Sequence, residues 1–268
     1  GVGWWFGSGP GSLIAVPAVA GGTYDAAAAT LTDAGFVPSQ KDEFSIDIPA
    51  GTVIETDPEE GARLDKGASV TVIVSAGPAT HTLDPLNGRA EQDARDYLTG
   101  LKVNVTDKSL LLFSDADAGI VINAYVTPRA GGDAYICGDG CEVFEDDTVE
   151  LYVSAGDFPD VAGMSVGEAT STLTDKGLTV TADPQYTFSD SVAKDVVIGV
   201  ADRAEEGNWR PGDSVQLIVS KGPELFPVPD VSGKTLNEAK KILSDKGFKS
   251  TYAAWGDLPG FAEMAKVT

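Results

Sequence analysis

Apolar positions recur along this 268-residue chain in a pattern that repeats. The alternating stretch VTVIVSAGP (70–78) returns as VELYVSAGD (149–157) and as VQLIVSKGP (215–223). Each stretch predicts one buried strand that ends in a turn. Because the phrase returns at intervals of about 65 to 80 residues, the chain is predicted to consist of several small modules rather than one large domain.

A second pattern precedes each of these strands and marks a helix. Four short segments, VPAVAG, LDPLNG, FPDVAG and VPDVSG, each close on a glycine. A small residue follows that glycine six positions on and a leucine ten positions on, which predicts an apolar stripe along one helix face. The stripes are Ala27 and Leu31, Ala94 and Leu98, Ala169 and Leu173, and, in the last module, Leu236, Ala239 and Leu243.

The expected ends of these helices carry their own signals. Ser165 with Glu168, and Thr235 with Glu238, have the spacing of a capping box, and Thr23 caps the first helix alone. Ala90 stands at that position in the second module, so no side-chain cap is expected there. Glycines at the C-terminal cap position are expected to end three of the helices, and these are Gly35, Gly177 and Gly247.

The order of elements predicts a small α+β module, with one helix packed on a three-stranded sheet. The modules are expected at 16–80, 81–156, 157–224 and 225–268, after a linker at 1–15. The second module carries an insertion, PRAGGDAYICGDGCEVFEDD. The fourth is expected to be truncated, because AKVT follows where its two closing strands should come. Short links between such small cores predict a linear array in the form of an elongated rod.

These residues resemble the PASTA repeat. The resemblance rests on the hydrophobic-Pro-x-Val-x-Gly start, the capped helix with its Ala and Leu, a Pro-x-x-Gly supplied by Pro58 and Gly61, and the closing V-x-V-x-V-S-x-G. It implies a non-catalytic region of one of two hosts. One is the extracellular part of an actinobacterial-type membrane Ser/Thr protein kinase, whose kinase domain lies outside this chain. The other is the C-terminal end of a class B penicillin-binding protein.

The first residues favour the kinase arrangement. Trp4, Trp5 and Phe6 form an aromatic cluster before a Gly/Ser/Pro spacer, and such residues favour the headgroup layer beside a membrane span. The start is therefore expected to be a juxtamembrane linker on the extracellular face of a single-pass membrane protein. A flexible tag with incidental aromatic residues is the alternative.

Composition narrows the chemistry further. The net charge of −22 argues against nucleic acid as a partner. No kinase motif is present, and the Ser-x-x-Lys at 191–194 lacks the companion motifs of a transpeptidase. His81 is the only histidine, and the acidic DADAG at 115–119 lacks the remaining ligands of a calcium loop. No catalytic site, metal or cofactor is therefore expected.

The two cysteines, Cys137 and Cys141, lie in the insertion as CGDGC. In an exported protein of this kind a disulfide is the default, and the intervening Gly-Asp-Gly can turn tightly enough to join the sulfurs. A redox Cys-x-x-Cys has one fewer intervening residue, and a zinc site would lack two ligands. We expect a disulfide that fixes the tip of a hairpin.

The PASTA resemblance implies signal transduction through peptidoglycan fragments (muropeptides) or a lipid-linked wall precursor. Formal charge is −7, −9 and −5 over residues 16–77, 81–155 and 158–222, but +1 over 226–268. Because muropeptide stems carry carboxylates, contact is expected in the fourth module. The candidate residues are Lys234, Lys240, Lys241, Lys246, Lys249, Trp255 and Phe261. A spacer rod that binds no ligand is the alternative, and an incomplete fourth module could self-associate by borrowing a strand.

Overall fold

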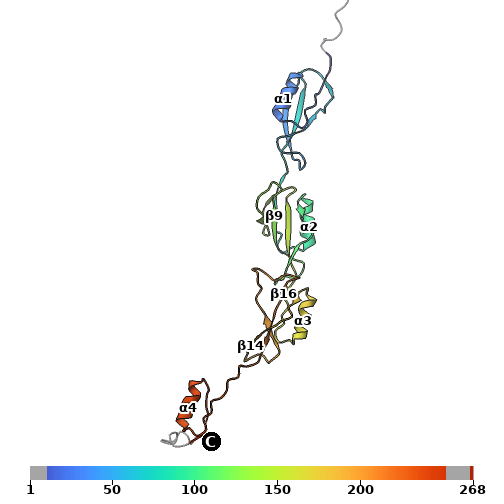
Figure 1. Cartoon of the computed structure of the whole chain (residues 1–268). Coiled ribbons are helices and arrows are strands. Elements are labelled where there is room, and N and C mark those ends of the chain that lie inside the picture. The colour runs from blue at the N-terminus through green and yellow to red at the C-terminus, as the bar shows by residue number, and fades with distance from the viewer. Residues whose placement is uncertain (1–10, 252–265, 268) are drawn as a thin grey trace, which may run out of the picture. The chain divides into compact units, whose positions relative to one another are not determined.

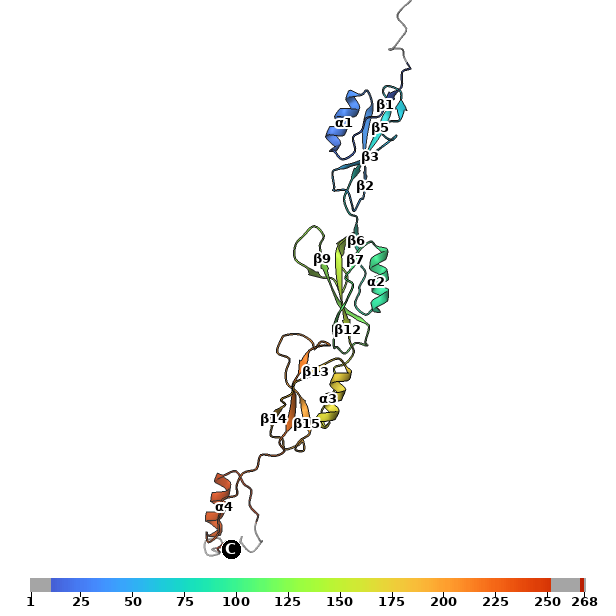
Figure 2. The same ribbon diagram turned by 45° about the vertical axis from the view of Figure 1, so that its right-hand side comes forward.

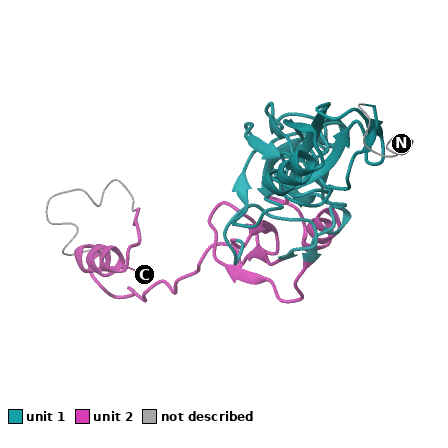
Figure 3. Ribbon diagram, turned by 90° about the horizontal axis from the view of Figure 1, so that it is seen from above, with its two compact units in different colours: residues 1–159, 174–179, 203–214 teal, residues 160–173, 180–202, 215–268 magenta. Residues whose placement is uncertain are grey.

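The computed structural model describes residues 11–251, 266 and 267. Its helices and small sheets confirm the predicted α+β class. The chain divides into two compact units, coloured separately in Figure 3. The first comprises residues 1–159, 174–179 and 203–214, and the second comprises the remainder. We call the expected modules 16–80, 81–156, 157–224 and 225–268 repeats one to four.

Repeat one packs a single helix on a three-stranded sheet (Figures 1 and 2). Strand β5 is central, with β2 parallel to it on one side and β3 antiparallel on the other. A short pair, β1 with β4, joins the start of the repeat to its loop. The elements are β1 (Ile14–Ala15), α1 (Tyr24–Asp33), β2 (Val37–Glu43), β3 (Val53–Asp57), β4 (Arg63–Leu64) and β5 (Ser69–Ser75).

The core of repeat one lies between α1 and this sheet. Ala27 and Leu31 are buried on the inner face of the helix, four residues apart as the 3.6-residue period requires. They pack with valines of β3 and β5, of which Val70 and Val72 are fully buried. The apolar stripe predicted from the sequence is therefore the face that holds the helix on the sheet.

Repeat two has the same plan with a wider sheet. Strand β12 is central and pairs with β9 antiparallel and with β7 and β8 parallel, while β10 extends the far edge of β9. The sheet therefore has five strands instead of the expected three. One addition comes from the insertion, and the other arises because β7 and β8 divide the single parallel strand of repeat one. The strands are β6 (Thr80–Thr82), β7 (Asn104–Val105), β8 (Leu110–Leu112), β9 (Val121–Thr127), β10 (Tyr135–Ile136), β11 (Glu142–Phe144) and β12 (Thr148–Ser154), and the helix is α2 (Glu91–Gly100).

Repeat three returns to three strands, in the order β14-β17-β15, with a short β13-β16 pair. Ala169 and Leu173 of its helix are buried, as predicted. In repeat four the equivalent Ala239 is buried, whereas Leu236 and Leu243 are half-buried. The elements are α3 (Val166–Asp175), β13 (Thr179–Val180), β14 (Gln185–Thr187), β15 (Val197–Val200), β16 (Ser214–Val215), β17 (Leu217–Ser220) and α4 (Leu236–Asp245).

The helix starts follow the sequence signals. Thr23 accepts a hydrogen bond from the Ala26 N–H, and the N–H of Glu238 donates to the Thr235 hydroxyl in a complete capping box. The box between Ser165 and Glu168 is also formed. Ala90 supplies no side-chain cap to α2, as expected.

Three of the four described helices are followed by a glycine in the left-handed conformation, and the helix of repeat two is not. Gly35, Gly177 and Gly247 have positive φ angles, which confirms the predicted left-handed caps. In repeat two the equivalent position is Lys102, with φ +59°. Its N–H donates to the carbonyl three residues back, as the Gly35 N–H does. A non-glycine residue in this conformation costs about 1–2 kcal/mol, so repeat two ends its helix under strain that the other repeats avoid.

Candidate functional site

Two lysines lie beside the first turn of α4. Thr235 and Lys266 form an isolated antiparallel bridge, and the Val267 N–H donates to the Lys234 carbonyl at 3.0 Å. The pKa of Glu238 is lowered, first by its hydrogen bonds with the Thr235 backbone and side chain and then by the charges of Lys234 and Lys266. The positive charges of Lys234 and Lys266 therefore both act on the Glu238 carboxylate at the start of α4.

Lys266 was absent from the residues predicted for this site. The same bridge occurs in the other repeats, as Thr23 with Thr52, Ala90 with Ile120, and Ser165 with Val196. Aligning AKVT with the start of β3 in repeat one would have placed Lys266 opposite Thr235. The sequence contained this signal, but using it required the register of a strand pair, which a helix pattern alone does not supply.

The other predicted lysines lie along α4 and just after it instead of forming one cluster. Lys241, Lys246 and Lys249 are exposed, and Lys240 is half-buried. Lys246 is the C-terminal cap residue, at the opposite end of the helix from Lys234. A ten-residue helix is about 15 Å long, which exceeds the Debye length of about 8 Å at physiological salt. The two ends of α4 therefore act as separate electrostatic sites.

Some predicted residues lie outside the described part of the chain. These are Trp255 and Phe261 of the expected binding face, and Trp4, Trp5 and Phe6 of the expected linker. Their roles stay predictions. Among the residues that are described, no helix is both long enough and apolar enough to span a bilayer. Within the same residues, no three His, Cys, Asp or Glu side chains are grouped to hold a metal ion.

His81 has a specific partner in the structure. It lies on β6, and its Nε2 is 3.2 Å from Oε1 of Glu145, with both side chains largely buried. The register pairs His81 with Val143 of β11. This histidine therefore joins the segment that enters repeat two to the insertion of the same repeat.

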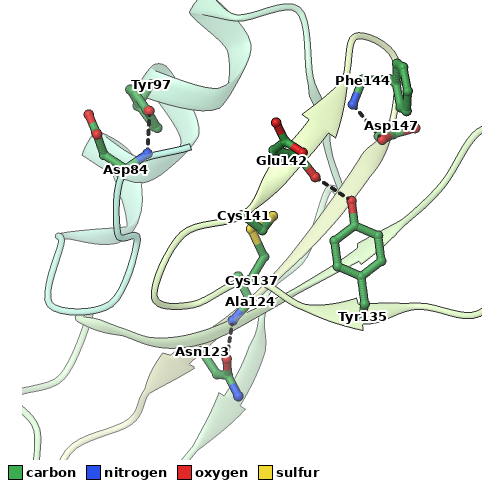
Figure 4. Close-up of a disulfide and its surroundings, with 10 residues drawn as sticks. All are labelled: Asp84, Tyr97, Asn123, Ala124, Tyr135, Cys137, Cys141, Glu142, Phe144 and Asp147. Atoms are coloured by element: carbon green, nitrogen blue, oxygen red, sulfur yellow. Dashed lines mark hydrogen bonds between the residues drawn. A yellow bond between two sulfur atoms is a disulfide. The ribbon is translucent and has the colours of Figure 1, made fainter. Parts of the chain in front are cut away.

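The disulfide joins Cys137 to Cys141 inside repeat two (Figure 4). Cys137 is buried, and its N–H donates to the Ala124 carbonyl of β9 at 2.8 Å. The Cys141 carbonyl accepts a hydrogen bond from the Leu83 N–H at 2.7 Å. The bridged loop thus attaches the start of repeat two to its sheet.

The prediction that the disulfide fixes the tip of a hairpin is wrong. Strand β10 before the loop pairs with β9, and strand β11 after it pairs with β6, so the two flanking strands belong to different sheets. The turn-forming residues made a local hairpin plausible, but both strands find longer-range partners. The disulfide therefore joins the end of one sheet to the start of another.

Both glycines of CGDGC are closely packed. Gly140 has φ +97°, and a Cβ there would lie 2.6 Å from the Leu83 carbonyl oxygen. A Cβ on Gly138 would lie 2.6 Å from Oδ1 of Asn123. The obstacle at Gly140 is a backbone atom, so that position needs glycine to hold the start of repeat two, whereas a side chain at Gly138 would require the Asn87 and Asn123 side chains to move.

Two segments of the chain match a known protein family. Residues 14–76 and 157–221 match the family model of the PASTA domain. These segments correspond to repeats one and three, the two with the regular three-stranded sheet. Repeats one and three are therefore PASTA domains.

Its relatives are bacterial serine/threonine-protein kinases. A probable kinase of Streptomyces coelicolor is 28% identical over 94% of this chain and 36% of the relative. Kinase PknB of Corynebacterium glutamicum is 29% identical over 87% and 34%, and PrkC of Bacillus subtilis is 30% identical over 85% and 33%. The chain spans about a third of the length of these relatives. It corresponds to a part of these kinases and carries two PASTA domains.

Two solved structures from Staphylococcus aureus are also similar. The three-PASTA-domain structure of a Ser/Thr kinase is 23% identical, with a TM-score of 0.42, over 78% of this chain and 100% of that chain. The entire extracellular region of PrkC is 22% identical, with a TM-score of 0.40, over 79% and 72%.

Proposed function

We propose that this chain is the extracellular wall-sensing region of a transmembrane Ser/Thr protein kinase. In this role it binds peptidoglycan fragments or a lipid-linked wall precursor through repeat four. The placement outside the membrane is supported by the two PASTA domains and by the kinases to which the chain is similar.

The observation that carries the proposal is the reversal of charge in repeat four. Repeats one to three are acidic, whereas residues 226–268 carry six basic and five acidic side chains. A carboxylate ligand is repelled by the acidic repeats and tolerated or attracted by the fourth. Long-range attraction is weak at physiological salt, so binding depends on local contacts.

The start of α4 provides such contacts. Lys234 is exposed, and Lys266 is exposed on the segment bridged to the helix start. A helix N-terminus also favours an anion because its first N–H groups point outward, although Glu238 already occupies that position here. The two lysines therefore offer the ligand carboxylate its cations.

The test is calorimetric titration of a soluble muropeptide into the whole chain at 0.15 M salt. Exposed ion pairs contribute about 0.2–1 kcal/mol each. Changing both Lys234→Glu and Lys266→Glu replaces two attractions with two repulsions, so we expect affinity to fall by about five- to thirtyfold, the equivalent of roughly 1–2 kcal/mol.

The matched control is Lys194→Glu, an exposed lysine of repeat three. It changes charge equally per residue but lies in an acidic repeat, and we expect an affinity within about twofold of the unmodified chain. Equal losses in both variants would contradict the placement of the site in repeat four. No saturable binding to the unmodified chain, together with no retention on insoluble peptidoglycan, would favour the spacer function instead.

A further inference from the structure

A pocket of about 580 Å³ lies where repeats one and two meet, inside the first compact unit. Its volume falls within the range of about 300–1,000 Å³ typical of small-molecule sites. Repeat one contributes residues 46–49 and Pro78, and repeat two contributes residues 128–131, Phe144, Glu145 and Asp147. Both sets come from loops or strand ends beside the connection between the repeats.

The walls of this pocket are mainly apolar. Ile46, Ile48 and Pro49 face it from repeat one, and Pro128 and Phe144 face it from repeat two. Phe144 is 51% exposed, so part of its ring is free to contact a ligand. The pocket therefore offers an aromatic ring and rigid proline rings to an apolar ligand.

Hydrogen bonds hold these walls in place. The Arg129 guanidinium donates from Nη1 to the Ile46 carbonyl at 2.6 Å and pairs through Nε with Asp146 at 3.2 Å. The buried Asp147 accepts hydrogen bonds from the N–H groups of Arg129 and Phe144, each at 2.9 Å. The pocket is thus formed before any ligand binds, which lowers the entropic cost of binding.

These contacts also leave one polar group uncommitted. Glu145 is paired with His81, and Arg129 and Asp147 are engaged as described. Asp47 is exposed at the rim, and among the described residues it makes no hydrogen bond or ion pair. Carboxylates outnumber the single guanidinium around the pocket, so its electrostatic potential favours a cation.

We propose that this pocket binds a small amphiphilic amine. The apolar body lies against Ile48, Pro78 and Phe144, and the ammonium group lies at the rim beside Asp47. Because the two walls belong to different repeats, such a ligand holds repeats one and two together. The site is separate from the muropeptide site proposed in repeat four, and neither depends on the other.

Three eight-carbon probes separate the apolar and the charged parts of this recognition. Octylammonium, octan-1-ol and octanoate are titrated into the whole chain, and amide shifts of residues 46–48 and 144–147 are followed by NMR. We expect saturable shifts at these residues with octylammonium, weaker binding of octan-1-ol and the weakest binding of octanoate. An order in which octanoate binds as well as octylammonium would overturn the assignment of an amine, and no saturable shift with any probe would overturn the pocket.

Two variants test the residues. Asp47→Asn is expected to weaken octylammonium binding by about two- to fivefold, as for one exposed ion pair, and to leave octan-1-ol binding unchanged. Phe144→Ala is expected to weaken both. The matched control is Phe188→Ala, which removes a 49% exposed phenylalanine from repeat three. Binding that survives Phe144→Ala, in a protein whose other amide shifts are unchanged, would contradict the proposal, as would an equal loss in Phe188→Ala.

Discussion

Repeats one and two both attach their first segment to their long loop, but they do so with different kinds of loop. In each, a short lead-in strand pairs with a strand from the long loop: β1 with β4, and β6 with β11. In each, backbone hydrogen bonds fasten the first core residue to that loop, through Val16 with Ala62 and through Leu83 with Cys141. Repeat one uses the Pro-x-x-Gly loop, and repeat two uses the disulfide-bridged CGDGC.

The difference teaches which parts of the fold are replaceable. The helix, the central strand and the lead-in pairing are common to both repeats, while the loop that receives the lead-in strand varies in length and in bonding. Repeat three has a loop of a third kind, organised by one arginine. There Arg203 pairs with Asp213 at 2.9 Å and donates to the carbonyls of Glu205 and Glu206.

The largest expected effect comes from placing a side chain on the glycine of each loop. Gly61→Ala meets no atom within 4 Å and pays the left-handed backbone cost of about 1–2 kcal/mol. Gly140→Ala pays that cost and also meets the Leu83 carbonyl at 2.6 Å, so about 3 kcal/mol or more is expected.

Amide hydrogen exchange measures each repeat separately, through Leu31 in repeat one and Leu98 in repeat two. Gly140→Ala should raise exchange at Leu98 and leave Leu31 unchanged, and Gly61→Ala should do the reverse to a smaller extent. Equal losses in the two variants would show that the close approach at Gly140 contributes nothing.

The next effect is loss of the disulfide. The closed loop is short, and the chain-entropy relation gives about 2 kcal/mol for it, less than for a long loop. The double variant Cys137→Ala with Cys141→Ala should therefore destabilise repeat two alone by about that amount. Urea unfolding followed by exchange at Leu98 and Leu31 checks this. Destabilisation of both repeats would mean that they unfold as one body.

Removing the helix cap of repeat one and adding a cap to repeat two should change the free energy of unfolding by about 1 kcal/mol each, in opposite directions. Thr23→Ala removes the hydrogen bond to the Ala26 N–H and should destabilise repeat one by about 1 kcal/mol. Ala90→Thr supplies α2 with the side-chain cap that it lacks and should stabilise repeat two by a similar amount. Thermal unfolding of the single variants measures both changes, and a loss of stability in Ala90→Thr would show that the Ala90 backbone rejects a capping side chain.

The smallest expected effect is a loss of stability at low pH, which should occur in the loop of repeat three but not at the disulfide of repeat two. Burial raises the pKa of Asp213, but hydrogen bonds from the Arg203 side chain and the Arg210 backbone, with the charges of both arginines, lower it overall below 3.8. A carboxylate with a depressed folded pKa contributes stability above its unfolded pKa and loses it as pH falls through the folded pKa.

The Arg203 contact should therefore weaken below about pH 4, whereas the disulfide of repeat two does not titrate. Exchange at the Arg210 amide between pH 6 and pH 3, corrected for intrinsic rates, measures the change, and Asp213→Asn should remove its pH dependence. A pH dependence that persists in Asp213→Asn would assign the effect to another carboxylate.

The sequence predicted the local structure of these repeats well and their long-range pairing poorly. Helix period, caps and terminal glycines are encoded within a few residues of where they act, and all three were correct. The pairing of His81 with Val143, and of Thr235 with Lys266, joins distant residues. The pattern of a single helix or strand does not specify which distant strand it pairs with. For this reason the hairpin prediction was wrong and Lys266 was not predicted.

The pocket between repeats one and two could not be predicted from the sequence. Its residues come from two repeats and are brought together by Arg129, whose contact with the Ile46 carbonyl no motif announces. The elongated rod expected from the short links between repeats stays a prediction. A radius of gyration well above the roughly 18 Å of a compact chain of this length would support it in small-angle scattering.

The loop that receives the lead-in strand differs between repeats, and this has a consequence for protein engineering. The segment between the second and the last long strand of a repeat accepts a proline turn, a disulfide-bridged insertion or an arginine-centred turn on the same scaffold. A foreign peptide grafted there should therefore be tolerated if it keeps a short strand to receive the lead-in segment, as β4 and β11 do. Successive repeats could then display different recognition loops from one chain, while helix and central strand are left untouched.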